Sequence, residues 1–206
     1  MASVQQASFL VVDDEPLVTR SLSRVLARFG SVTTAGTLGG ACEQLLARTD
    51  WSGFVIDLRL GDGSGLDVLT QVRQRYPLAP AILLSGAMDP EGINGAFALG
   101  ARCLCKPWPR EFLQSFAREA LVTQQEIPRR ITEAVSDLAS RHALTPAQTE
   151  ILSAAVRGID RASIVAARRV SENTHKTQVR GILRKTQTLS LGELRDRVLR
   201  SVAGAA

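Results

Sequence analysis

Cysteine is scarce in this chain of 206 residues, with three in all, at positions 42, 103 and 105. So few cysteines exclude a disulfide framework and are typical of a reducing cytoplasm. Cys103 and Cys105 are one residue apart, but the sequence has no companion Cys or His motif that would complete a zinc site. We therefore expect these two cysteines to be small buried residues.

Long apolar runs are also missing. No stretch approaches the roughly 18–20 consecutive apolar residues that a membrane-spanning helix needs. The chain does not open with a charged segment followed by a long apolar one, which argues against a signal peptide. These absences predict a cytoplasmic protein with no membrane partner.

Lysine is the third scarce residue. Of the 25 basic residues 22 are Arg, and Lys stands at positions 106, 176 and 185. The two residues are not interchangeable, because Lys presents a compact point charge whereas Arg presents a planar fork of donors. Where a sequence so rich in Arg uses Lys, we expect a site that requires a compact ammonium group, and Lys106 is the first candidate.

Apolar strand-like runs alternate with helical stretches in the first part of the chain. Between the first two runs, for example, Val18, Leu22 and Val25 recur at helical spacing, and Gly30 ends the helix. Such alternation predicts an α/β fold with a parallel, doubly wound sheet of five strand–helix units. Continuous apolar strands fit a sheet covered on both faces. The expected strands are 9–12, 31–34, 54–56, 81–84 and 102–105.

Polar residues follow four of these strands: Asp13 and Asp14 the first, Asp57 the third, Ser85 the fourth and Lys106 the fifth. In an open α/β sheet the carboxyl ends of the strands collect the chemistry. Three carboxylates, a hydroxyl and an ammonium in one cleft suit a Mg²⁺ ion and a phosphoryl group. Taken alone, an Asp pair after a strand is equally often a helix N-cap. The whole set at successive strand ends favours the site.

Four motifs carry a resemblance to a known family: VVDDEP at 11–16, DLRLGDGSGLDVL at 57–69, LLSG at 83–86 and GARCLCKPW at 100–108. The region of about 7–122 resembles a response-regulator receiver domain. The resemblance implies that Asp57 is the phospho-acceptor, a nucleophile that forms an acyl phosphate. It also implies that Lys106 and Ser85 contact the phosphoryl oxygens.

A magnesium cofactor is a further implication of this resemblance. Asp14 would bind Mg²⁺ directly and Asp13 through water, with Asp57 beside them. The backbone carbonyl of Arg59 would add another ligand. Oxygen ligands with several retained waters are what Mg²⁺ prefers.

Two positions depart from the receiver pattern. Gly61 stands where receivers commonly have Pro, which predicts a looser loop after Asp57. Cys103 stands where receivers usually have Tyr or Phe, whose ring turns inward when the hydroxyl moves toward the phosphoryl group. We therefore expect an intact phosphorylation site whose readout is altered at Cys103.

Charge separates the two halves of the chain. Residues 1–123 hold 11 basic and 12 acidic residues, a net charge of −1, whereas residues 124–206 hold 14 and 8, a net charge of +6. A basic module predicts a polyanionic partner. The alternative, a solvated helical surface, would carry the same charge without a partner.

The second half is expected to be helical. Residues 123–126 lack apolar periodicity and predict a linker, after which Pro128 begins a helix that runs to about Arg141. Four short helices follow, the first capped by Thr145 and the third by Ser171. The predicted domains are 1–123, a linker with a helix at 124–141, and 142–206.

The motifs LTPAQTEIL at 144–152 and VSENTHKTQVRGILRKT at 170–186 resemble the LuxR-type helix-turn-helix output domain of response regulators. In that family the third helix reads DNA. Helical spacing turns Val179 and Ile182 inward. His175 also falls on the inner face, where the family usually has Val, and we expect it to be partly exposed at the edge of the core. The resemblance implies base contacts from Lys176, Thr177 and Arg180, and phosphate contacts from Ser171, Thr174, Arg184 and Lys185.

These features predict a cytoplasmic two-component response regulator. A sensor histidine kinase would phosphorylate Asp57 and thereby control binding to duplex DNA and transcription, with a homodimer as the active form. Such a protein is regulatory and catalyses only its own phosphoryl transfer and dephosphorylation.

Two alternatives remain open. A haloacid-dehalogenase-like phosphatase also uses Mg²⁺, Asp, Ser and Lys. It places its nucleophile in an Asp-x-Asp pair on the first strand, whereas here the adjacent Asp pair is early and the lone Asp57 central. The other alternative is an RNA-binding or protein-interaction output, against which the Thr-His-Lys-Thr-Gln-Val-Arg helix argues.

Overall fold

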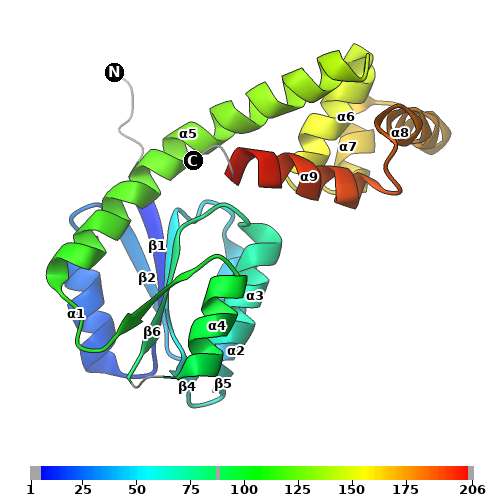
Figure 1. Ribbon diagram of the computed structural model, residues 1–206. Coiled ribbons are helices and arrows are strands. Elements are labelled where there is room, and N and C mark those ends of the chain that lie inside the picture. The colour runs from blue at the N-terminus through cyan, green and yellow to red at the C-terminus, as the bar shows by residue number, and fades with distance from the viewer. Residues whose placement is uncertain (1–5, 87–88, 204–206) are drawn as a thin grey trace. The chain divides into compact units, whose positions relative to one another are not determined.

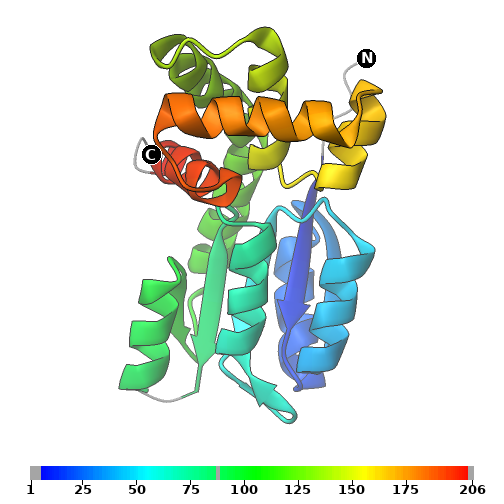
Figure 2. The same cartoon turned by 90° about the vertical axis from the view of Figure 1, so that its right-hand side faces the viewer.

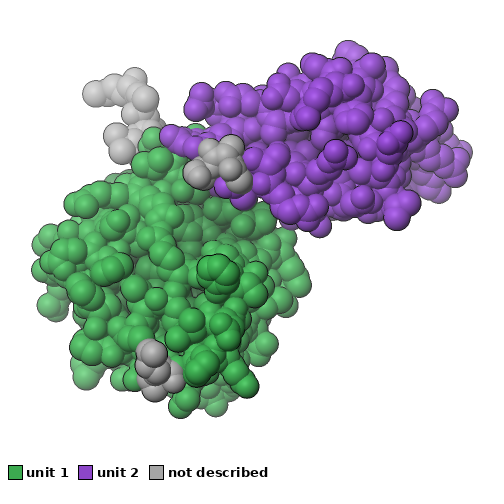
Figure 3. All heavy atoms as spheres, in the orientation of Figure 1, with its two compact units in different colours: residues 1–125 green, residues 126–206 purple. Residues whose placement is uncertain are grey.

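The structure is a computed structural model that describes residues 6–86 and 89–203. It divides into two compact units between Gln125 and Glu126 (Figure 3). The first unit combines a sheet with helices, and the second is helical (Figure 1). None of the described helices combines the length and the apolar character that crossing a bilayer requires.

A parallel five-stranded sheet forms the centre of the first unit, in the order β2-β1-β3-β6-β7. Each of the five expected strands lies within one of the observed strands, so the prediction of a parallel α/β sheet is confirmed. The strands are β1 (Ala7–Val12), β2 (Gly30–Ala35), β3 (Gly53–Asp57), β6 (Ala81–Ser85) and β7 (Arg102–Cys105).

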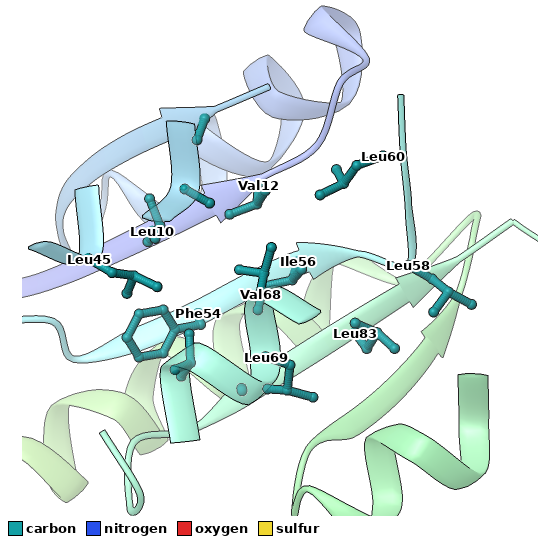
Figure 4. Close-up of a cluster of buried hydrophobic side chains, with 14 of the residues drawn as sticks. Leu10, Val12, Leu45, Phe54, Ile56, Leu58, Leu60, Val68, Leu69 and Leu83 are labelled. Carbon is teal, nitrogen blue, oxygen red and sulfur yellow. The ribbon is translucent and has the colours of Figure 1, made fainter. Parts of the chain in front are cut away.

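Helices cover both faces of this sheet (Figures 1 and 2). Residues of α1 and of the first half of α5 pack with one set of strand side chains, which includes Val11 and Val55. Residues of α2, α3 and α4 pack with the alternate set, which includes Leu10, Phe54 and Ile56 (Figure 4). Burial on both faces explains why these strands are apolar without alternation. The helices are α1 (Pro16–Leu26), α2 (Leu38–Ala47), α3 (Gly65–Arg75), α4 (Pro90–Ala98) and α5 (Arg110–Arg141).

The segment after Asp57 is more regular than the sequence predicts. Instead of a loose loop it forms an antiparallel hairpin of β4 (Arg59–Leu60) and β5 (Gly63–Ser64). The side chain of Asp62, at the tip, accepts hydrogen bonds from the amides of Leu38 (2.8 Å) and Gly39 (3.3 Å). These bonds satisfy amides at the start of α2, so they hold the hairpin against that helix.

The boundary between the two units falls within the predicted linker at 123–126, but the stretch is helical. Pro128 does not begin a helix as predicted, because α5 continues through the linker as one helix of 32 residues with Pro128 inside. Proline removes one helical hydrogen bond. Contacts on either side offset this loss: Glu126 pairs with Arg130 one turn later, and Gln124 accepts a hydrogen bond from Ser52 at 2.9 Å.

The second unit contains the second part of α5 and the four short helices expected from the sequence. The side chains of Thr145 and Ser171 cap α6 and α8 as predicted. The apolar core of this unit includes Ile151, Leu152 and Ile182. The four helices are α6 (Pro146–Val156), α7 (Arg161–Arg168), α8 (Glu172–Thr186) and α9 (Leu191–Ala203).

Two expectations about burial are wrong. His175 is not partly exposed but 3% exposed, because its place on the inner face of α8 puts it inside the packed core. Cys105 is exposed although Cys103 is half-buried. The reason is that β7 lies at the edge of the sheet, where no further strand covers its outer side.

Candidate functional site

Three charged side chains from three strand ends meet in the first unit. The ammonium nitrogen of Lys106, after β7, lies 2.7 Å from Oδ1 of Asp57 and 3.0 Å from Oδ2 of Asp13. Asp57 ends β3 and Asp13 follows β1, and these strands are neighbours. Oδ1 of Asp57 and Oδ2 of Asp13 therefore lie closer to each other than the sum of their two distances to the ammonium nitrogen.

Hydrogen bonds to backbone amides fix the orientation of both carboxylates. Oδ2 of Asp57 accepts from the amide of Arg59 at 3.0 Å, and Oδ1 of Asp13 accepts from the amide of Glu15 at 2.9 Å. Helix α3 begins close to this point: a Cβ atom at Gly65 would lie 2.0 Å from the carbonyl oxygen of Asp57. Glycine is therefore required where the helix approaches the Asp57 backbone.

The remaining residues expected at this site differ in exposure. Ser85 is buried at the end of β6, and its carbonyl oxygen accepts from the amide of Lys106 at 2.7 Å. Asp14 and Arg59 are exposed. A Cβ atom at Gly61 would lie 3.5 Å from Oδ2 of Asp14, so the tip of the hairpin passes beside this carboxylate.

Burial and charge act against each other in this cluster. Burial raises the pKa of Asp13, and hydrogen bonds from the amide of Glu15 and the ammonium of Lys106 offset part of that effect. Burial alone would lower the pKa of Lys106, but its hydrogen bonds to Asp57 and Asp13 and their charges raise it above the usual range. Lys106 is therefore a permanent cation at neutral pH.

The donor set at this edge of the sheet fits a hard divalent cation. Asp13, Asp14 and Asp57 supply carboxylate oxygens, which Mg²⁺ prefers over nitrogen and sulfur. Asp14 is exposed, so water can complete the coordination shell of an ion there. The described residues hold no group of three or more His, Cys, Asp or Glu side chains already gathered around one point, and the ammonium of Lys106 bridges two of the carboxylates. The set thus fits an ion that keeps several waters rather than an all-protein cage.

Two residues at this site were missed in the sequence. Glu15 lies 3.5 Å from the ammonium of Lys106, and Asp62 connects the hairpin after Asp57 to α2. The VVDDEP motif contains Glu15, but an exposed Glu has no distinctive sequence signal. Asp62 lies in a Gly-Asp-Gly sequence, a turn signal that predicts a hairpin when short strands flank it.

In the second unit, α8 presents a polar outer face. Lys176, Thr177 and Arg180 are exposed, whereas Ile182 and Thr186 are buried. This arrangement agrees with the helical spacing of the sequence. Neither Lys176 nor Arg180 forms an ion pair with another residue of the described chain.

The four residues expected to contact phosphates have different surroundings. Ser171 caps the helix, since its Oγ accepts from the amide of Thr174 at 3.1 Å, and both are exposed, as is Arg184. The ammonium of Lys185 instead donates to the carbonyl oxygen of Ala143 (2.6 Å) and to Oε1 of Gln148 (3.0 Å). Lys185 therefore joins α8 to the turn between α5 and α6.

A comparison with protein families matches the response regulator receiver domain to residues 9–118. The chain belongs to this family. The matched region contains Asp13, Asp14, Asp57, Ser85 and Lys106, which is the whole set of strand-end residues.

Relatives and solved structures of receivers are similar to this chain. The probable transcriptional regulatory protein TcrX of Mycobacterium tuberculosis is 37% identical over 112 residues, which cover 53% of this chain and 47% of that protein. The alginate biosynthesis transcriptional regulatory protein AlgB of Pseudomonas aeruginosa is 34% identical over 137 residues, covering 66% and 30%. This chain thus spans less than half the length of these relatives.

Among solved structures, the signal receiver domain of an HD domain-containing protein from Pseudomonas fluorescens Pf-5 has a TM-score of 0.54 and 27% identity. The match covers 59% of this chain and 99% of that one. The receiver domain therefore accounts for the first unit.

Proposed function

We propose that this receiver accepts a phosphoryl group on Asp57 from a sensor histidine kinase, and that phosphorylation controls binding of the second unit to duplex DNA and so transcription. The observation that carries the first part is the contact of Lys106 with Asp57 and Asp13 at the ends of three strands. The transcriptional regulators among the relatives support the second part.

Each side chain has a defined role in phosphoryl transfer. A carboxylate oxygen of Asp57 attacks the phosphorus of the donor and forms the P–O bond of an acyl phosphate, while the bond between phosphorus and the kinase donor breaks and the donor leaves without its phosphoryl group. Lys106, already placed beside the acceptor oxygen, then neutralises charge on a phosphoryl oxygen, while the hydroxyl of Ser85 donates to another. Asp13, Asp14 and the carbonyl of Arg59 would hold Mg²⁺ beside Asp57, and the bound ion would supply further positive charge for the incoming group.

Labelling with a small phosphodonor tests the acceptor. In the presence of Mg²⁺ the protein should acquire one acid-stable, base-labile phosphoryl group. Asp57→Asn should abolish labelling, and Asp14→Ala should nearly do so. Asp67→Asn, which changes a carboxylate in the first turn of α3, is the matched control and should label normally. Equal labelling of the Asp57→Asn protein would exclude the assignment.

The proposed output is a helix-turn-helix in which α8 enters the major groove. Its outer face presents Lys176, Thr177 and Arg180 to base edges. Ser171, Thr174 and Arg184 are exposed beside them and suit phosphates. The net charge of +6 over residues 124–206 favours a polyanion.

Binding of duplex DNA by the full chain tests the output. Lys176→Ala and Arg180→Ala should each cost about 1–3 kcal/mol and relax sequence preference at one position, because each would remove a base contact. Arg157→Ala, an exposed residue after α6, should bind like the wild type. An active homodimer should protect two half-sites about one helical turn apart, roughly 10 base pairs. Tighter binding of RNA than of duplex DNA would favour an RNA-binding output.

A further inference from the structure

The second unit contains a cavity of about 350 Å³ between the end of α6, α7, α8 and the start of α9. Apolar side chains make up much of its lining, namely those of Ile159, Ile164, Val179 and Leu191. Three basic residues also line it, which are Arg161, Lys176 and Arg180. None of the described residues that line it is acidic. The cavity thus combines an apolar surface with an excess of positive charge.

A buried histidine adds an unsatisfied polar group to this lining. His175 lines the cavity, is 3% exposed, and its Nδ1 has no hydrogen-bond partner among the described residues. Burial, followed by the positive charges of Arg161 and Arg168, lowers the pKa of this imidazole. The ring is therefore neutral at neutral pH. A buried polar nitrogen without a partner is rare and costs free energy.

The surrounding ion pairs compensate only part of this positive charge. Arg161 pairs with Glu172, and Arg168 pairs with Glu150 at 3.2 Å. Lys176 and Arg180 have no acidic partner within the described chain. An anion at the cavity would therefore meet two unpaired cations as well as the imidazole.

We propose that this cavity binds a small carboxylic acid that carries an apolar chain or ring. Its apolar body would replace water against Ile164, Val179 and Leu191, and the hydrophobic effect would favour this transfer. Its carboxylate would lie among Arg161, Lys176 and Arg180, where hydrogen bonds to charged donors are stronger than neutral ones. The volume falls within the range of small-molecule sites. Inorganic phosphate would leave the apolar lining without a partner.

Regulation of DNA binding follows if the proposed function holds. Lys176 and Arg180 line the cavity and also belong to the face of α8 that we propose reads bases. A bound carboxylate would neutralise their charge and hold their side chains away from the groove. The acid and the DNA should therefore compete, so that the ligand lowers the affinity of the protein for its operator.

Calorimetric titration of the full chain tests the cavity directly, with octanoate as the probe and 1-octanol as its uncharged counterpart. Octanoate should bind with a stoichiometry of one, and octanol about tenfold more weakly, since it lacks the charge-assisted hydrogen bonds. His175→Leu and Arg161→Gln should weaken octanoate binding, and Ala155→Leu should block it by filling the cavity. Arg157→Gln, which does not line this cavity, is the matched control and should bind like the wild type.

Nuclear magnetic resonance of the His175 ring gives a second measurement. Because a nearby carboxylate favours the imidazolium, octanoate should raise the pKa of His175, and octanol should not. Absence of saturable octanoate binding, or equal affinity in the wild type, His175→Leu and Arg161→Gln proteins, overturns the proposal.

Competition is measured separately. Octanoate should weaken DNA binding by the wild type and have little effect on Ala155→Leu. Saturable octanoate binding without any effect on DNA affinity would show that the cavity binds the acid but that the acid and the DNA do not compete. Absence of DNA binding without octanoate would reject the proposed output instead.

Discussion

The ammonium nitrogen of Lys106 lies 2.7 Å from Oδ1 of Asp57, closer than its 3.0 Å contact with Asp13. The proposed acceptor oxygen therefore already has a cation in contact before a phosphoryl group arrives. Phosphoryl transfer depends chiefly on positioning and on neutralising charge, and this contact supplies part of both.

Replacement of Lys106 by Met should slow labelling of Asp57 by about tenfold or more, since one charge-assisted contact of roughly 1.5–3 kcal/mol is lost. The same change leaves the buried carboxylate of Asp13 without its counter-charge. The pKa of Asp13 is already raised by burial and should rise further. The variant should therefore be destabilised more at pH 7 than at pH 4, where a larger fraction of Asp13 is protonated and needs no counter-charge.

Urea unfolding at the two pH values measures this difference, with Arg110→Met as a control that removes an exposed cation near the start of α5. A Lys106→Met protein that labels at the wild-type rate would show that the ammonium is not needed at the acceptor.

Arg73 makes a second set of contacts, this time with backbone. Its guanidinium donates to the carbonyl oxygens of Leu99 (2.6 Å), Ala79 (2.6 Å), Gly100 (3.0 Å) and Tyr76 (3.3 Å). It thereby joins α3 to the turn between α4 and β7. Arg73→Met keeps much of the apolar stem but leaves these carbonyls unsatisfied, so we expect the free energy of unfolding of the first unit to fall by about 3 kcal/mol.

Chemical denaturation measures this loss, and Arg75→Met is the matched control because Arg75 is exposed on the same helix. Equal stability of the two variants would mean that the Arg73 contacts contribute nothing beyond surface packing.

Local signals in the sequence predicted much of this fold. The apolar runs predicted the five strands, and the polar residues that end them, Asp57 and Lys106 among them, lie together because parallel strands share one edge. The caps at Thr145 and Ser171 were also predictable from local sequence, since each side chain accepts a hydrogen bond from an amide three residues later.

What the sequence could not predict depends on distant contacts. The side chain of Gln124, inside α5, accepts a hydrogen bond from Ser52, 72 residues earlier. Lys185 donates to Ala143 and Gln148, 42 and 37 residues away. His175 is buried because of how neighbouring helices pack, and a helical pattern gives the direction of a side chain but not the depth of its cover.

Lys185 and Arg184 provide a test of the proposed phosphate contacts. Arg184 is exposed, so Arg184→Gln should lower DNA affinity. It should also reduce the slope of log affinity against log salt concentration by about one, the amount expected for one lost phosphate contact. Lys185→Met should instead destabilise the second unit by about 1–3 kcal/mol, because it removes the donor to Ala143 and Gln148. Salt-dependent binding and thermal unfolding of both variants separate the two roles. If Lys185→Met instead reduces the salt dependence of DNA binding and leaves the stability of the second unit unchanged, Lys185 contacts a phosphate as the sequence predicted.

Cys103 bears on how phosphorylation is read out. It is half-buried on β7 and packs against the core cluster on the side of α2, α3 and α4. A thiol is too small to change that surface as a ring would, so phosphorylation should shift the populations of two states weakly. Cys103→Tyr should therefore increase the gain in dimerisation or DNA binding that beryllofluoride produces. Cys42→Tyr is a control for a large ring elsewhere in the unit, and a large wild-type gain that Cys103→Tyr leaves unaltered would contradict this account.

His175 makes the stability of the second unit dependent on pH. Burial and the charges of Arg161 and Arg168 lower its folded-state pKa below the usual 6.5, and Glu172 and Glu150 pair with those two arginines. A lowered pKa in a basic group means that the unfolded chain binds the proton more readily. The contribution of His175 is therefore fully present above about pH 6.5 and is lost as the pH falls below it.

Hydrogen exchange at amides of α8, corrected for intrinsic rates, should show protection that decreases between pH 7 and pH 5 in the wild type. His175→Val should remove most of this decrease, whereas replacing the chain's other histidine, His142→Gln, should retain it because the buried imidazole is still present. The same decrease in His175→Val as in the wild type would place the pH-sensitive group elsewhere.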